Sequence, residues 1–280
     1  LADDYHARGQ ILQIAAQGKF AYATIENGGV QIFDITNPLN PTWVTGIEVD
    51  GAPKGLLLDG TLMYLAVDSG NDRGVVVVDI SNPFQARRIN HIAIEKGVQR
   101  LRISAGRLYF INAKGLGVIA LGNPTQPQLL PGYPAKINDL WIDDKRIYLA
   151  TDQGMEVLDV RLNVKSRYKS VREGSLVRAR GTPVFLSVAG LGIRVLNVTD
   201  GTVRPVSLFN PDELLSDLRL DDGVLYATGQ DAHLLTIDIT DLRRLKIQSL
   251  YPLARPATGI TLTNNTALLA GHDIITSVKL

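Results

Sequence analysis

The 280-residue sequence contains no cysteine and almost no excess of charge of either sign. The absence of cysteine excludes disulfide frameworks, cysteine metal sites and thiol catalysis. With 29 Lys+Arg and 28 Asp+Glu, the net charge is +1, which argues against a nucleic-acid partner and against polybasic membrane binding. Hydrophobic residues make up 45% and charged residues 20%, a balance that is typical of a globular protein.

Long hydrophobic runs are also missing. The longest purely aliphatic run is Val75–Val78, far short of the roughly 18 residues that a membrane helix needs, so we expect no direct membrane insertion. The chain does not open with a basic segment followed by an apolar one, as a signal peptide would. Because the sequence starts at Leu1, we expect a processed protein or part of a larger polypeptide.

Helical periodicity is almost absent, with one helical turn expected over Pro211–Asp217 after the N-cap Asn210. The chain instead repeats itself: GVQIFDITNP at Gly29–Pro38 matches GVVVVDISNP at Gly74–Pro83. A large apolar marker also recurs every 37 to 45 residues. The markers are Tyr22, Tyr64, Tyr109, Tyr148, Phe185, Tyr226 and Leu268.

Each repeat holds four short β-type runs, which we letter a to d in chain order. A tight turn joins a to b, as at Asp59-Gly60, Ala105-Gly106 or Asn264-Asn265, where a two-residue hairpin needs positive φ. Four antiparallel strands about every 40 residues are typical of a β-propeller blade. The sequence therefore predicts an all-β fold, a seven-bladed β-propeller of four-stranded antiparallel blades, as one domain over residues 1–280. A stack of β-sandwiches is the main alternative.

The seventh repeat shows only runs a to c, from about Gly259 to Lys279. Residues 1–7 precede the first run, so we expect them to form the outer strand of the last blade and close the ring. The alternative is a fourth strand supplied from beyond Leu280.

The repeats resemble the LVIVD repeat family, whose members form propellers. The match rests on Phe33–Pro41 (FDITNPLNP) and Val77–Pro83 (VVDISNP). Weaker copies occur at Ala120–Pro124, Val195–Asp200 and Thr236–Asp241. The resemblance implies an extracytoplasmic bacterial protein (periplasmic, secreted or on the cell surface). It transfers no catalytic residues.

An aspartate ends run c in several repeats, at Asp34, Asp79, Asp159 and Asp238. A catalytic group is needed once, whereas a residue repeated around a ring has the same structural task in each blade. We expect these carboxylates to accept backbone N–H groups in the c–d turns.

No motif indicates a cofactor or a catalytic residue. His233 and His272 lie in b–c turns beside Asp231 and Asp273, where imidazole and carboxylate groups suit a divalent ion, but polar residues are also usual in exposed turns. We predict no metal site and no cofactor.

Run a carries charges between its apolar positions. Because strand a lies nearest the axis of a propeller, these residues are candidates for binding a ligand in the channel or at its mouth. They are Arg100, Arg102, Asp139, Arg178, Asp217 and Arg219. The alternative is ion pairing between neighbouring blades.

Three functions fit these observations. The first is a non-enzymatic interaction or scaffold module. The second is a lactonase-, lyase- or hydrolase-like propeller enzyme with a polar or metal site at the channel mouth. The third is a glycan binder, but the only tryptophans, Trp43 and Trp141, lie in apolar patterns and are expected in the core.

The loops favour one end of each blade as the binding face. The a–b and c–d turns are repetitive, whereas the b–c and d–a loops differ in length and chemistry. The irregular segments are Asp68–Gly74, Pro131–Lys136, Asn210–Ser216, Asp231–His233 and Leu253–Pro256. Function on repeat scaffolds concentrates where loops differ, so we expect a protein or glycan partner on the b–c/d–a loops.

Overall fold

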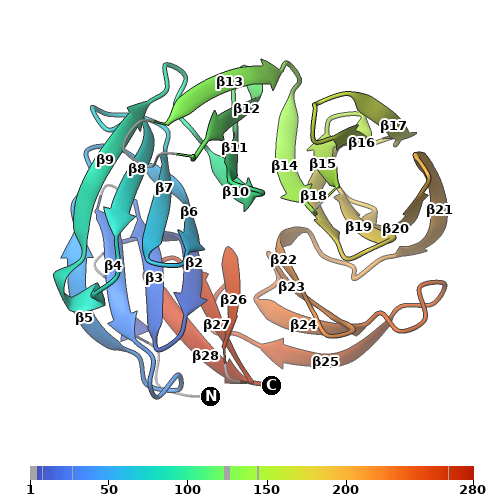
Figure 1. Ribbon diagram of the computed structural model, residues 1–280. Helices are drawn as coiled ribbons and strands as arrows, with labels where there is room; N and C mark the ends of the chain where they lie inside the picture. The colour runs from blue at the N-terminus through green and yellow to red at the C-terminus, as the bar shows by residue number, and fades with distance from the viewer. Residues whose placement is uncertain (1–4, 8, 27, 123–126, 144, 264) are drawn as a thin grey trace. The chain divides into compact units, whose positions relative to one another are not determined.

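The computed structural model describes residues 5–7, 9–26, 28–122, 127–143, 145–263 and 265–280 (Figure 1). These residues form seven sheets of four antiparallel strands, which confirms the predicted seven-bladed β-propeller. The chain divides into two compact units. The first holds residues up to 101, residues 123–127 and residues from 253 on, and the second holds residues 102–122 and 128–252.

The first unit contains blades 1, 2 and 7. Blade 1 is β2(Ile11–Gln17), β3(Phe20–Ile25), β4(Gly29–Asp34) and β5(Thr42–Ile47). Blade 2 is β6(Pro53–Asp59), β7(Leu62–Val67), β8(Gly74–Asp79) and β9(Arg87–Ala93). Blade 7 is β26(Gly259–Thr263), β27(Thr266–Gly271), β28(Ile274–Lys279) and β1(Tyr5–His6).

The second unit contains blades 4, 5 and 6, and blade 3 apart from its first two residues. Blade 3 is β10(Arg100–Ser104), β11(Arg107–Asn112), β12(Gly115–Ala120) and β13(Gln128–Tyr133). Blade 4 is β14(Ile137–Ile142), β15(Arg146–Thr151), β16(Gly154–Asp159) and β17(Val164–Lys169). Blade 5 is β18(Gly174–Ala179), β19(Pro183–Val188), β20(Gly192–Thr199) and β21(Thr202–Phe209). Blade 6 is β22(Leu215–Asp221), β23(Val224–Gly229), β24(His233–Asp238) and β25(Lys246–Pro252).

The seven apolar markers all lie on strand b, as the spacing predicts. Six of them are buried, and Tyr226 is partly exposed. Strands b and c are apolar on both faces, and Val75–Val78 is an uninterrupted buried run. Within each unit, the apolar clusters lie between neighbouring blades: 7 and 1, 1 and 2, 3 and 4, 4 and 5, and 5 and 6. A blade therefore completes its core only against its neighbours.

The a–b turns have the backbone geometry that their residues predict. Ala105 and Gly106 have φ values of 49° and 69°, as a two-residue hairpin requires. Asn265 has φ 58°, and Asn264 lies outside the described residues.

The helical turn expected over Pro211–Asp217 is absent. Its last three residues belong instead to β22(Leu215–Asp221), because Leu218 is buried against β23 and sheet pairing outweighs the capping signal of Asn210. A single helical turn is present instead at Pro83–Gln85, where the Asn82 side chain accepts a hydrogen bond from the Phe84 N–H. No helix among the described residues is long and apolar enough to cross a bilayer.

The repeated aspartates have the predicted role in the c–d turns. Asp34 Oδ1 accepts the N–H of Thr36 at 2.7 Å, and Asp79 Oδ1 accepts that of Ser81 at 3.0 Å. Asp159 and Asp238 accept from the backbone of Arg161 and Thr240 in the same way. Hydrogen bonds from Thr36, Ser81 and Thr240 hold the pKa values of Asp34, Asp79 and Asp238 below the usual range.

These lowered pKa values predict acid sensitivity. A carboxyl whose folded pKa is below its unfolded value stabilises the fold above about pH 4, and that stabilisation is lost as the pH falls through the folded pKa. The melting temperature of a D34N/D79N/D238N variant should lie below that of the wild type at pH 6, and the difference should narrow below pH 4. Thermal melts from pH 6 to pH 2 test this. A difference that is constant with pH would contradict it.

The N-terminus completes blade 7, as predicted. Tyr5 and His6 pair with Ile275 and Ile274 of β28, and the Ala7 N–H donates to the Asp273 carbonyl at 2.5 Å. The first four residues of the predicted segment lie outside the described residues. The first unit thus joins the beginning of the chain to its end.

Deleting residues 1–7 should lower the melting temperature and promote association, because the edge of β28 would be exposed for pairing with another chain. Differential scanning fluorimetry and size-exclusion chromatography measure the two effects. A monomeric deletion variant with the wild-type melting temperature would show that this pairing does not stabilise the fold.

Candidate functional site

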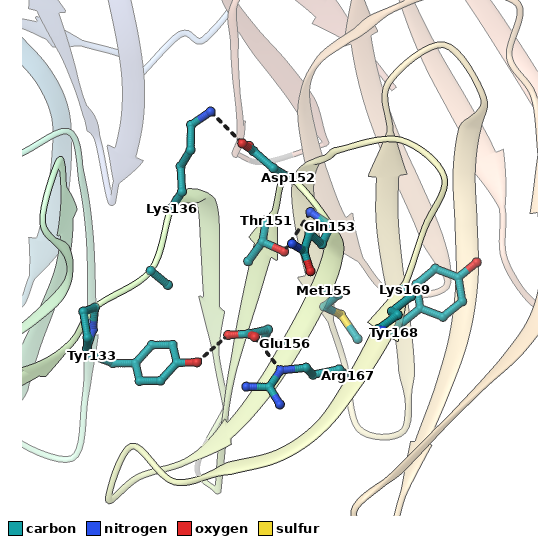
Figure 2. Close-up of a pocket in the computed structure, with 12 residues that line it drawn as sticks. Tyr133, Lys136, Thr151, Asp152, Gln153, Met155, Glu156, Arg167, Tyr168 and Lys169 are labelled. Carbon is teal, nitrogen blue, oxygen red and sulfur yellow. Dashed lines mark hydrogen bonds and ion pairs between the residues drawn. The ribbon is translucent and has the colours of Figure 1, made fainter.

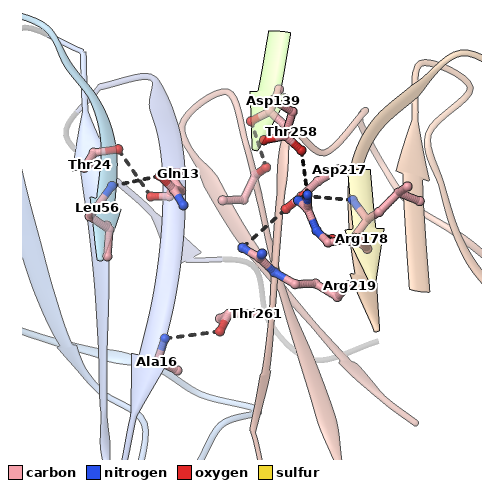
Figure 3. Close-up of polar contacts among 12 residues, drawn as sticks. Gln13, Ala16, Thr24, Leu56, Asp139, Arg178, Asp217, Arg219, Thr258 and Thr261 are labelled. Atoms are coloured by element: carbon pink, nitrogen blue, oxygen red, sulfur yellow. Dashed lines mark hydrogen bonds and ion pairs between the residues drawn. The ribbon is translucent and has the colours of Figure 1, made fainter. Parts of the chain in front are cut away.

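Three of the predicted site residues form a buried ion cluster on the first strands of blades 4, 5 and 6. Arg178 lies on β18, and its Nη1 donates to Asp139 Oδ2 of β14 at 2.6 Å. Its Nη2 donates to Asp217 Oδ1 of β22 at 2.9 Å. Figure 3 shows the guanidinium between the two carboxylates. The side chains of Arg178, Asp139 and Asp217 are 1%, 0% and 10% exposed, so the charges are shielded from solvent.

Backbone groups complete this cluster. Arg178 Nε donates to the Leu218 carbonyl at 2.7 Å, and Nη1 also donates to the Val177 carbonyl at 2.7 Å. Asp139 Oδ2 in turn accepts the Val177 N–H at 3.1 Å. The charged residues therefore link the first strands of adjacent blades, which no β-ladder joins.

Two more predicted residues border the cluster. The guanidinium carbons of Arg102 and Arg178 each lie 5.4 Å from the centre of the Trp141 ring, within cation–π range. Arg219 Nη2 lies 3.6 Å from Asp217 Oδ2. Arg100 is the first residue of β10, is partly buried, and belongs to the first unit, whereas the other five belong to the second.

The electrostatics keep Arg178 charged. Burial would lower its pKa, but Asp139 and Asp217 outweigh that effect and hold the pKa above its usual value. The arrangement is the ion pairing between blades that the sequence left as one alternative. Binding of a ligand by these residues remains a prediction.

Removing the buried guanidinium should be strongly destabilising. Arg178→Ala removes the cation that Asp139 and Asp217 share and leaves Asp217 only the longer contact to Arg219, so we expect a loss of about 3–5 kcal/mol of unfolding free energy. Arg219→Ala removes only the longer, partly exposed contact of 3.6 Å to Asp217 and should cost about 1 kcal/mol. Urea denaturation of both variants tests this, and equal small losses would show that the buried pairs contribute little.

The tryptophans differ from expectation. Trp43 was expected in the core, but it is 44% exposed, because it lies on the outermost strand of blade 1, where one face meets solvent. Trp141 is partly buried against the two arginines.

The two histidines considered as ligands of a divalent ion, His233 and His272, belong to separate units. His233 begins β24 in the second unit, and His272 lies in the b–c turn of blade 7 in the first. Within the described part of the chain, no group of three His, Cys, Asp or Glu residues is arranged to hold a metal ion.

Among the described residues, two surface cavities and a much smaller hollow lie at the end of a blade where its b–c turn meets the preceding d–a loop. The blade-4 pocket has a volume of about 320 Å³ and is lined by residues 133–136, 151–153, 155–156 and 167–169. The blade-6 pocket, of about 400 Å³, is lined by Gly190, Asn210, Asp212, Glu213, Leu214, Gln230 and Asp231. A smaller one in blade 7 is lined by residues 253–257 and by residues of β27 and β28. The irregular loops thus form cavities, as functional loops do.

Two ion pairs hold the walls of the blade-4 pocket (Figure 2). Lys136 Nζ of the d–a loop donates to Asp152 Oδ2 of the b–c turn at 2.6 Å. Arg167 Nε donates to Glu156 Oε1 at 2.6 Å, and the Tyr133 hydroxyl donates to Glu156 Oε2 at 2.8 Å.

These contacts shift the pKa values of the pocket residues. The bond to Asp152 raises the pKa of Lys136, and the bond from Lys136 lowers that of Asp152. Burial, followed by the bond to Glu156, raises the pKa of the Tyr133 hydroxyl. Tyr133 therefore remains protonated and Lys136 charged at neutral pH, as the hydrogen bonds require.

Sequence reasoning identified the loop Pro131–Lys136 but missed Asp152, Glu156 and Arg167. Glu156 and Arg167 are directly opposite on paired strands, so their opposite charges could have been found from the strand register. The contact between Lys136 and Asp152 joins two loops, and no local pattern in the sequence indicates it.

A known sequence family matches the first part of the chain. Residues 8–47 and 52–85 match the LVIVD repeat. The first two blades carry LVIVD repeats. These are the two repeats with the strongest motifs, so the predicted resemblance is confirmed there. No curated protein matches this chain in sequence.

Solved structures share the fold at low sequence identity. A chain of the Mitotic Checkpoint Complex is 11% identical, with a TM-score of 0.82 over 99% of this chain and 93% of that one. The β-propeller domain of Cps50 (Swd1) from Myceliophteria thermophila is 11% identical, with a TM-score of 0.78 over 99% and 100%. The computationally designed Ika8 protein is 12% identical, with a TM-score of 0.70 over 100% and 98%. At such identities the likeness shows the fold alone.

Proposed function

We propose that this protein is a non-enzymatic interaction module of an extracytoplasmic or cell-surface bacterial protein, and that it binds a protein partner on its b–c and d–a loops. The observation that carries the proposal is the position of the blade-4 and blade-6 pockets, each of which is lined in part by a b–c turn and a d–a loop. Binding and catalytic residues are often found on loops that a rigid scaffold positions.

The chemistry of the two ends supports this choice. At the a–b/c–d end, Asp34, Asp79, Asp159 and Asp238 use their carboxylates for bonds within their own turns. At the b–c/d–a end, the blade-4 pocket is rich in cations and the blade-6 pocket in acids. A surface with such differences between blades can select one partner and one orientation.

The similar solved structures are consistent with an interaction role, since one of them is part of the Mitotic Checkpoint Complex. The proposal of an extracytoplasmic location follows from the LVIVD resemblance.

Exposed lysines at both ends allow a direct test. Lys96, Lys114, Lys136 and Lys169 lie at the b–c/d–a end, whereas Lys19 and Lys145 lie in a–b turns. A partner captured by the purified protein should be cross-linked by an amine-reactive reagent to lysines of the first group, as identified by mass spectrometry.

The a–b lysines are the matched control, because they are also exposed and react with the same reagent. Cross-links confined to Lys19 and Lys145 would contradict the proposal. A K19E/K145E variant should capture the partner as the wild type does.

A further inference from the structure

The strongest candidate for a specific contact is the blade-4 pocket. We infer that it binds carboxylate side chains of an acidic segment in the protein partner. This inference rests on the proposed function and narrows it to one cavity and one chemistry.

Each carboxylate oxygen of the pocket already accepts a hydrogen bond from within the protein. Glu156 accepts from Arg167 Nε through one oxygen and from the Tyr133 hydroxyl through the other. Asp152 accepts from Lys136 Nζ through Oδ2 and from Asn138 Nδ2 through Oδ1, the latter at 3.2 Å. Part of the acceptor capacity of both carboxylates is therefore used within the pocket.

The cations keep donors for a ligand. An ammonium group carries three N–H donors and a guanidinium five, whereas Lys136 and Arg167 each use one in the bonds to Asp152 and Glu156. Their side chains are 79% and 55% exposed, against 37% for Asp152 and 17% for Glu156. With the exposed Lys169, the lining presents three cations and two partly covered carboxylates, so positive charge dominates at the surface.

The geometry favours a ligand with more than one carboxylate. In Figure 2, Lys136 and Arg167 lie toward opposite ends of the pocket, with Asp152 and Glu156 between them. Neighbouring acidic residues of an extended segment can contact both cations at once. A volume of about 320 Å³ accommodates side chains and lies at the low end of the roughly 300–1,000 Å³ found for small-molecule sites.

A peptide fits this pocket better than a sugar acid. Of the two tyrosines in the lining, Tyr168 packs against the apolar cluster between blades 4 and 5, and the Tyr133 hydroxyl donates to Glu156. The exposed Trp43 lies in blade 1 of the other unit. Recognition in the pocket therefore depends on charge-assisted hydrogen bonds.

The test uses three fluorescein-labelled peptides with six consecutive Glu, Gln or Lys residues, and fluorescence anisotropy with the full chain. The Glu peptide should bind saturably and weaken as salt rises, and the Gln and Lys peptides should not bind. Lys136→Gln should weaken binding about tenfold, the effect of losing one charge-assisted hydrogen bond. Lys145→Gln removes the same charge from the a–b turn of the same blade and should leave affinity unchanged.

Two further variants keep the test decisive. Arg167→Gln should also weaken binding, with a thermal melt to verify that the protein folds. Asp212→Asn, in the blade-6 pocket, should have no effect. Equal binding of the Gln peptide, or unchanged affinity in Lys136→Gln, would overturn the inference. So would Lys136-dependent binding of glucuronate oligomers without binding of the Glu peptide, which would assign the pocket to a sugar acid.

The two proposals fail in different ways. Partner cross-links at the b–c/d–a lysines, together with an absence of Glu-peptide binding, would overturn the acidic-segment inference and leave the proposed function standing. Cross-links confined to the a–b turns would overturn the proposed function itself.

Discussion

The contact between the first strands of neighbouring blades depends on side chains, because no β-ladder joins those strands. Gln13 Oε1 of blade 1 accepts the Leu56 N–H of blade 2 at 2.8 Å. Asp139 Oδ2 of blade 4 accepts the Val177 N–H of blade 5 at 3.1 Å. The pairing of strands a and b shifts register just before Gln13 in blade 1 and just before Asp139 in blade 4. The two residues are therefore at equivalent positions of the repeat. A buried N–H without a partner is costly, and an acceptor at this position satisfies one in the next blade.

The chemistry of that acceptor determines what else must be present. An amide such as Gln13 is neutral, whereas a buried carboxylate such as Asp139 needs a cation close by. Arg178 supplies the cation through Nη1, and its Nη2 donates to Asp217. The three charges thus behave as one structural group across blades 4 to 6. Trp141 packs against the guanidinium from the strand-a position opposite the apolar marker, the position that Arg178 and Arg219 themselves occupy in blades 5 and 6.

Features that depend on short stretches of chain could be predicted from the sequence. The apolar markers, the a–b turns and the aspartates of the c–d turns each depend on contacts within one blade, and the repeat makes them visible several times. The two ion pairs, Asp139–Arg178 and Arg178–Asp217, each join residues 39 positions apart, about one blade. This spacing means that the pairing could also have been predicted from the sequence. Trp43 was misplaced because alternation does not show which strand is outermost. The contact between Lys136 and Asp152 needed the folded loops.

The two ends of a blade differ in how freely their residues can change. In the c–d turns, a carboxylate such as Asp79 is held by the turn that it stabilises, so a substitution there affects folding first. In the b–c and d–a loops, Lys136 and Asp152 bond to each other beside a cavity, and among the described residues the one side-chain bond that they make to a strand is that from Asn138 of β14 to Asp152. Exposed ion pairs contribute little to stability, so their residue types are open to selection by a ligand. The same fold can therefore keep one end constant for folding and diversify the other for recognition.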